Sequence, residues 1–194
     1  PMIEQQSSQL LPEVFAALAE APQVSVLHIG PVQPETVAFF STFRCTLHVN
    51  DLFAELPFAV DEEDDQCTRR QLRELLVFPD AARFDLCLFW DLFNYLDAEA
   101  VSALMDTLRP HLVPGALAHC FAVHNTRSPQ QDVKYSIVSP AELALRPRGQ
   151  RLPGYAPHSQ GRLNTLLHGF NVQRSVLLAH SRLELLLKSA AFRE

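Results

Sequence analysis

The chain has 194 residues, a length that fits one domain, and its 47% hydrophobic and 20% charged residues exclude disordered and fibrous classes. Its formal net charge of -6 disfavours nucleic acid as a partner, because a surface that follows phosphates needs an excess of Lys and Arg. We expect a cytoplasmic protein that does not contact a membrane, since no apolar run approaches the roughly 20 residues of a membrane span and no secretory signal is visible. The four cysteines are widely spaced, so we expect reduced and mostly buried thiols.

The first part of the chain predicts alternating helices and strands. Apolar spacing and strand composition indicate, in order, a helix over residues 10–20, a buried strand over 24–30, a helix over 35–43 and a strand over 45–50. The expected organisation is therefore an N-terminal helical segment, residues 1–23, followed by a single α/β domain over residues 24–194.

The second part continues the alternation and ends differently. It indicates a helix over 67–78, a strand over 84–90, a helix that Asp97 caps and that reaches 108, and a strand over 116–123. A long, partly irregular excursion over the sheet edge follows at 125–160, then a helix over 161–168 and strands over 172–178 and 183–188. The last two strands are joined by only a few residues and must pair antiparallel. The predicted fold class is α/β: one open, mostly parallel sheet with helices on both faces and a C-terminal antiparallel hairpin.

We expect no metal site. The acids at 61–65 precede the predicted helix 67–78, where negative charge complements the helix dipole, and adjacent acids on one exposed run are usually solvated. His119, Cys120 and His124 resemble a ligand cluster, but His119 and Cys120 face opposite sides of a strand. We interpret these three residues as structural.

Four short motifs occur in the order and spacing of one known family. Residues 26–30 (VLHIG) lie where that family has its first-strand motif, and residues 84–96 (FDLCLFWDLFNYL) look like its fourth-strand motif. Residues 108–115 (LRPHLVPG) resemble the turn before its fifth strand, and residues 169–172 (GFNV) resemble the start of its sixth. Over residues 24–188 the chain resembles the class I S-adenosylmethionine-dependent methyltransferases. The resemblance implies their Rossmann-like fold, S-adenosylmethionine as the cofactor and methyl transfer as the reaction.

The glycine-rich first loop departs from the family pattern. Where the family has D/E-x-G-x-G-x-G, residues 28–34 read HIGPVQP, so Gly30 is the one glycine that remains. Pro31 and Pro34 have no N–H to donate, and His28 cannot act as a carboxylate toward the cofactor's ammonium group. We therefore expect weak or altered cofactor binding at this degenerate loop.

The resemblance implies a cofactor site made of Gly30, Asp51, Trp90 and Asp91. Asp51 follows the first loop by about 20 residues, the spacing at which an acid reaches the ribose hydroxyls, but it suits an N-cap before residues 52–56 equally well. Trp90 and Asp91 lie at the carboxyl end of the fourth strand, where open α/β sheets bind ligands. The alternative for this pair is a packed aromatic ring beside a surface acid.

Four further residues are candidates for contact with the methyl acceptor. Asn94 and Tyr95 follow the fourth strand, while Tyr155 and His158 lie in the long excursion and are placed to close over an acceptor. Isolated tyrosines and histidines are also common as ordinary polar residues, and this alternative stays open. No catalytic residue is assigned, because the cofactor's sulfonium supplies the electrophile and the protein mainly aligns the acceptor.

Three functional hypotheses follow from these residues. The first is a methyltransferase-like enzyme with an unknown small-molecule or protein acceptor. The second is a catalytically silent copy of the fold that acts as a binding or regulatory partner, in a homodimer or with another protein, through its N-terminal helix or the edge of its C-terminal hairpin. The third keeps the sheet but binds a nucleoside or a decarboxylated analogue. Asp51→Ala separates the first two, because it abolishes cofactor binding in the first and leaves partner binding intact in the second.

Overall fold

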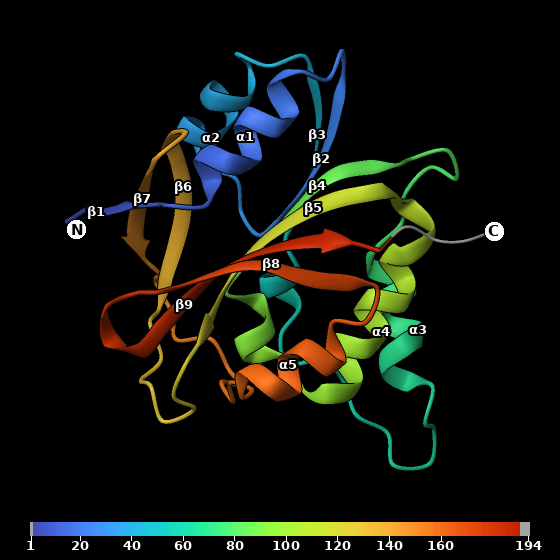
Figure 1. Ribbon diagram of the computed structural model, residues 1–194. Coiled ribbons are helices and arrows are strands. Elements are labelled where there is room, and N and C mark those ends of the chain that lie inside the picture. Colours follow the sequence, from blue (N-terminus) through green and yellow to red (C-terminus); the bar gives the residue numbers. More distant parts are fainter. Residues whose placement is uncertain (1, 191–194) are drawn as a thin grey trace.

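The computed structural model describes residues 2–190, which form one large six-stranded sheet and a smaller three-stranded one (Figure 1). The large sheet contains β2 (Val24–Ile29), β3 (Cys45–Asn50), β4 (Phe84–Trp90), β5 (Leu112–Val123), β8 (Phe170–Leu177) and β9 (Arg182–Ser189), in the order β3-β2-β4-β5-β9-β8. β2 is parallel to β3 and β4, and β4 is parallel to β5, whereas β9 is antiparallel to β5 and β8. The predicted mostly parallel sheet with a C-terminal antiparallel hairpin is confirmed.

Helices cover both faces of the large sheet. Figure 1 shows α1 (Leu11–Ala19) and α2 (Pro34–Phe40) on one side, and α3 (Cys67–Leu75), α4 (Ala98–Leu108) and α5 (Gln160–Leu166) on the other. The predicted cap of α4 is confirmed, since the Asp97 side chain accepts a hydrogen bond from the Ala100 N–H at 2.8 Å. Within residues 2–190, no helix has both the length and the apolar character that crossing a bilayer requires.

The apolar face of α1 belongs to the core. Its buried residues follow helical spacing and are Leu11, Val14, Phe15 and Leu18. This packing leaves only the opposite face of α1, which includes the exposed Glu13, Ala16 and Ala17, open to a partner, and the role of the helix in association stays a prediction. Cys87 and Cys120 are buried free thiols, while Cys45 and Cys67 are free but only half-buried.

The expected partly irregular excursion over residues 125–160 contains two strands that the sequence did not predict. This segment contains an antiparallel hairpin of β6 (Val133–Ser139) and β7 (Glu142–Pro147), and β1 (Glu4–Ser7) pairs with β7 to give the order β1-β7-β6. Tyr135 and Ile137 alternate with polar residues along β6, and the intervening Ser136 is buried as well. The prolines and arginines of the segment lie mostly outside the two strands and concealed this short alternation.

Two polar contacts join the small sheet to α2. The Ile137 N–H of β6 donates to Thr36 Oγ1 of α2 at 3.0 Å, and Arg146 of β7 forms an ion pair with Glu35. β1 lies in the predicted segment 1–23 and pairs with β7, which lies in the predicted domain 24–194. The two parts therefore share a sheet. The division into 1–23 and 24–194 stays a prediction, and residues 191–194 lie outside the described part.

Candidate functional site

The first loop begins at Gly30, directly after β2. Gly30 has a φ of +111°, a conformation that a side chain disfavours, and its N–H donates to the Asn50 carbonyl of β3 at 2.8 Å. A Cβ at this position would lie 3.2 Å from the Phe53 ring and 3.8 Å from Cδ1 of Trp90. The rings of Phe53 and Trp90 therefore occupy the space that the missing side chain leaves beside Gly30.

His28 takes the place of the family's acid and is bound on both of its ring nitrogens. Trp90 Nε1 donates to His28 Nε2 at 3.1 Å, and His28 Nδ1 donates to the Gly30 carbonyl at 3.2 Å, since a carbonyl can only accept. Burial lowers the pKa of His28 to about 4. The imidazole is thus neutral at physiological pH and has no free position for a ligand.

Trp90 lies in an aromatic stack that joins the two sheets. Its ring is parallel to that of Tyr135 within 3°, with centroids 5.3 Å apart, and Tyr135 in turn stacks on Phe121 at 5.0 Å. Arg182 donates to the Tyr135 hydroxyl at 3.0 Å, and burial raises the pKa of this tyrosine. The hairpin thereby places a tyrosine directly against Trp90, and the packed-aromatic interpretation of Trp90 holds.

Asp91, in contrast, is not a surface acid. Its side chain is buried, and among residues 2–190 its Oδ1 has no hydrogen-bond partner. Burial raises the pKa of Asp91 to about 7, against the opposing charges of Arg148 and Arg182. Asp91 borders a cavity of about 20 Å³ that Asn94 and Tyr155 also line. A space of this size holds about one water molecule and excludes a methyl acceptor.

The other predicted acceptor residues make hydrogen bonds to the backbone. The Tyr95 hydroxyl donates to the Gln131 carbonyl at 3.4 Å, and the Tyr155 hydroxyl donates to the Ser128 carbonyl at 2.8 Å. His158 Nε2 donates to the Leu96 carbonyl at 2.6 Å. Tyr95 lines a separate cavity of about 170 Å³. Asn94, Tyr155 and Asp91 are therefore brought together, whereas Tyr95 and His158 are turned to other contacts.

Asp51, like Asp91, keeps a carboxylate oxygen without a hydrogen-bond partner. It precedes the short 3₁₀ helix Leu52–Glu55 in the N-cap position, but its side chain makes no capping hydrogen bond. Its Oδ1 is buried and has no partner among residues 2–190. The N-cap alternative is therefore not realised by the side chain, and the role of Asp51 in binding stays a prediction.

Four residues of this region are absent from the sequence-based prediction: Phe53, Tyr135, Arg148 and Arg182. The Arg148 guanidinium lies over the Phe53 ring, 4.6 Å from its centroid. Arg148 and Arg182 are also the two cations that act on Asp91. The alternation of Val133, Tyr135 and Ile137 would have revealed β6, but no local pattern marks either arginine.

Few groups at this position are left to hold S-adenosylmethionine. Five of the cavities in the described residues, with volumes from about 20 to about 470 Å³, are lined by residues other than Gly30, Asp51 and Trp90. A cofactor of that size needs a pocket of roughly 300 Å³ or more. His28 offers no negative charge to the ammonium group, and only the free oxygen of Asp51 matches the expected recognition.

Comparison with known proteins identifies the fold of the chain. No protein-family model and no curated protein sequence matches the chain. Among solved structures, the CcbJ methyltransferase from Streptomyces caelestis has a TM-score of 0.54 and 14% identity, over 93% of this chain and 94% of the other. An S-adenosylmethionine-dependent methyltransferase from Clostridium acetobutylicum has a TM-score of 0.52 and 11% identity, over 93% and 91%.

A third similar structure contains bound molecules. The 1,6-didemethyltoxoflavin-N1-methyltransferase from Burkholderia thailandensis, with bound 1,6-didemethyltoxoflavin and S-adenosylhomocysteine, has a TM-score of 0.52 and 16% identity over 94% of this chain and 79% of the other. Identities this low establish the architecture and not the chemistry. The strand order, the antiparallel hairpin and these similarities agree: the chain has the fold of the class I S-adenosylmethionine-dependent methyltransferases.

Proposed function

We propose that this protein is a catalytically silent member of the methyltransferase fold that acts by binding a partner. One observation carries the proposal: Phe53 and Trp90 pack against Gly30, the residue around which the cofactor loop of this fold is organised. Tyr135 then covers Trp90 from the hairpin side. A ligand at this position would have to displace aromatic rings that are at most 4% exposed.

The electrostatics of the region also support this proposal. S-adenosylmethionine carries an ammonium group and a sulfonium, both of which favour a nearby carboxylate. His28 is neutral, and the pKa of about 7 leaves Asp91 only partly ionised at neutral pH. Arg148 and Arg182 add positive charge close to Asp91. The region is therefore unfavourable for a cationic cofactor.

The open edge of the C-terminal hairpin is one surface at which a partner could bind. In the large sheet β8 pairs with β9 on one side, and its other side is an edge. Leu177, near the end of β8, is 64% exposed. Exposed edge strands with apolar side chains are common sites of association.

The test is a calorimetric titration of the folded protein with S-adenosylmethionine and S-adenosylhomocysteine. The B. thailandensis enzyme serves as the positive control, since its structure holds S-adenosylhomocysteine. We expect no saturable heat with either compound up to about 1 mM. Saturable binding in the micromolar range would overturn the proposal.

The second candidate function is S-adenosylmethionine-dependent methyl transfer, and the unpaired Oδ1 of Asp51 is the observation that favours it. The same titration of Asp51→Ala separates the two functions. Micromolar binding by the wild type that Asp51→Ala abolishes would assign the ribose contact to this residue and support the enzyme. Equal absence of binding in both proteins supports the silent fold.

A further inference from the structure

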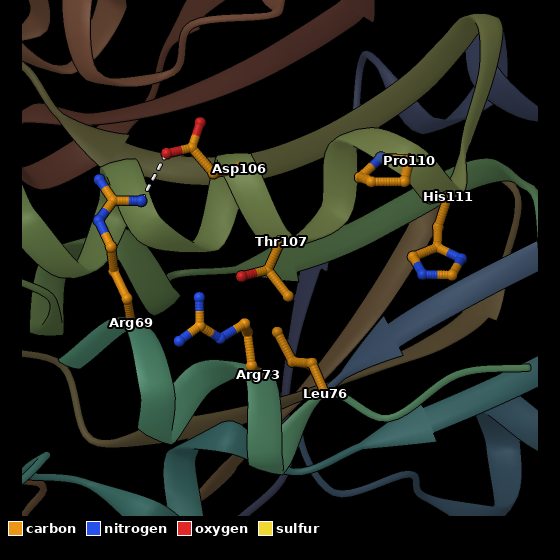
Figure 2. A pocket seen from close by; sticks show the side chains of 7 residues that line it. All are labelled: Arg69, Arg73, Leu76, Asp106, Thr107, Pro110 and His111. Atoms are coloured by element: carbon orange, nitrogen blue, oxygen red, sulfur yellow. Dashed lines mark hydrogen bonds and ion pairs between the residues drawn. The ribbon is translucent and has the colours of Figure 1, made fainter. Parts of the chain in front are cut away.

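A groove of about 340 Å³ lies between α3 and α4, away from the predicted cofactor residues (Figure 2). Arg69, Arg73 and Leu76 line it from α3 and the residue that follows it, and Thr107 lines it from α4. His111 closes one end from the turn that follows α4. Small-molecule sites have this size and combine an apolar floor with a few polar groups.

The charges in the groove do not cancel. Arg69 forms an ion pair with Asp106 at 2.5 Å, and His168 Nε2 lies 3.5 Å from the other carboxylate oxygen of Asp106. Among residues 2–190, the Arg73 guanidinium has no hydrogen bond or ion pair to an acceptor. Figure 2 shows Arg73 extending from α3 into the space beside Thr107. The lining therefore holds two guanidinium groups against one carboxylate, which is already engaged.

The remaining polar groups have fixed orientations. His111 Nδ1 donates to the Ala82 carbonyl at 2.9 Å, so its Nε2 is left for another contact. The His111 ring is held in place by an edge contact with Phe78, with centroids 5.2 Å apart. Thr107 Oγ1 donates to the Ala103 carbonyl at 2.8 Å and can therefore only accept from a ligand.

The apolar part of the lining sets the second requirement for a ligand. Leu76 is buried and Pro110 is exposed beside His111, so together they offer a nonpolar surface next to the charged one. An inorganic ion would contact Arg73 and leave this surface in water. A ligand with an anionic group and an apolar body matches both parts.

We propose that this groove binds a small organic anion, with its carboxylate or phosphate group on Arg73 and its apolar body against Leu76 and Pro110. Arginine suits this role because its planar fork donates two hydrogen bonds to either anionic group. None of the residues lining the groove belongs to the predicted cofactor site, so the proposal stands independently of the catalytic state of the protein.

The test is an NMR titration of the ¹⁵N-labelled protein with phenyl phosphate, benzoate and inorganic phosphate. We expect saturable shifts at Arg73 and Thr107 with one of the two aromatic anions, at a Kd of about 1 mM or below. Inorganic phosphate should bind at least about tenfold more weakly, because it lacks the apolar body. The better of the two aromatic anions identifies the preferred anionic group.

Two variants check the position of the site. Arg73→Gln is expected to raise the Kd at least about tenfold without changing the melting temperature, because this side chain is exposed. Arg44→Gln removes another exposed arginine, one that does not line the groove, and should leave the Kd unchanged. The inference fails if neither aromatic anion saturates below about 10 mM, or if the two variants bind alike.

Discussion

Replacing Asp91 by asparagine is expected to stabilise the protein near neutral pH. The side chain is 5% exposed and its Oδ1 has no partner among residues 2–190, so ionisation costs solvation that no hydrogen bond restores. Burial raises the pKa of this carboxyl from its ordinary 3.8 to about 7. Since a tenfold change in acidity corresponds to about 1.4 kcal/mol, full ionisation lowers the free energy of unfolding by about 4 kcal/mol.

The sign of the effect fixes its pH dependence. The unfolded chain releases the Asp91 proton near pH 4, whereas the folded chain holds it until about pH 7. The contribution of this group to stability is therefore complete below pH 4 and is lost as the pH rises to 7. An asparagine side chain has no proton to lose, so Asp91→Asn should gain about 2 kcal/mol at pH 5 and about 4 kcal/mol at pH 8.

Urea unfolding followed by the fluorescence of Trp90, the one tryptophan of the chain, measures this difference at both pH values. Asp80→Asn removes an exposed carboxylate and should change the free energy of unfolding by less than about 0.5 kcal/mol. An equal gain at pH 5 and pH 8, or a loss of stability at pH 8, would refute the reasoning. Either result would mean that Arg148 and Arg182 hold Asp91 ionised.

Three further predictions concern the residues around Trp90. Because burial lowers the pKa of His28 from 6.5 to about 4, this group contributes about 3 kcal/mol less to the free energy of unfolding at pH 4 than at pH 6.5, a change opposite in sign to that of Asp91. His28→Gln removes this change, so its stability relative to the wild type should rise by about 3 kcal/mol from pH 6.5 to pH 4; a constant difference between the two proteins would contradict a buried neutral imidazole. Tyr135→Ala should cost about 3–5 kcal/mol by emptying the stack, against about 1 kcal/mol for Tyr135→Phe in the same denaturation assay; similar losses would count against the stack. Thr36→Val should speed hydrogen exchange at the Ile137 amide and cost about 1–3 kcal/mol, and unchanged exchange would show that the hairpin is held elsewhere.

The parallel part of the fold was predictable because its signals are local. Residues 84–90 form an apolar run that only Asp85 interrupts, and β4 has the same limits in the structure. Asp97 caps α4 as its residue type and position predict. By contrast, β1 is a polar tetrapeptide, EQQS, which is a strand only because β7 lies beside it. No periodicity in its own sequence could indicate that pairing.

For the candidate site, the sequence predicted which cofactor-binding groups are missing, but not which contacts take their place. The residues alone indicate that His28 and the prolines weaken the cofactor loop. They do not indicate that Trp90 donates to His28, because that contact depends on the register between β2 and β4. Nor do they place Tyr135 on Trp90, since α4 and β5 lie between the two rings along the chain. Contacts between distant segments follow from tertiary packing, which local propensity does not encode.

The aromatic stack of Trp90, Tyr135 and Phe121 also bears on how long the folded chain persists in a cell. A protein that binds a small molecule only in its folded state gains stability with the concentration of that molecule, about 2.7 kcal/mol at one hundred times the Kd. In this protein the stacked rings of Trp90, Tyr135 and Phe121 fill the space beside the first loop. Under the proposed silent function, the population of folded protein, and with it the resistance to proteolysis, does not depend on the supply of methyl donor.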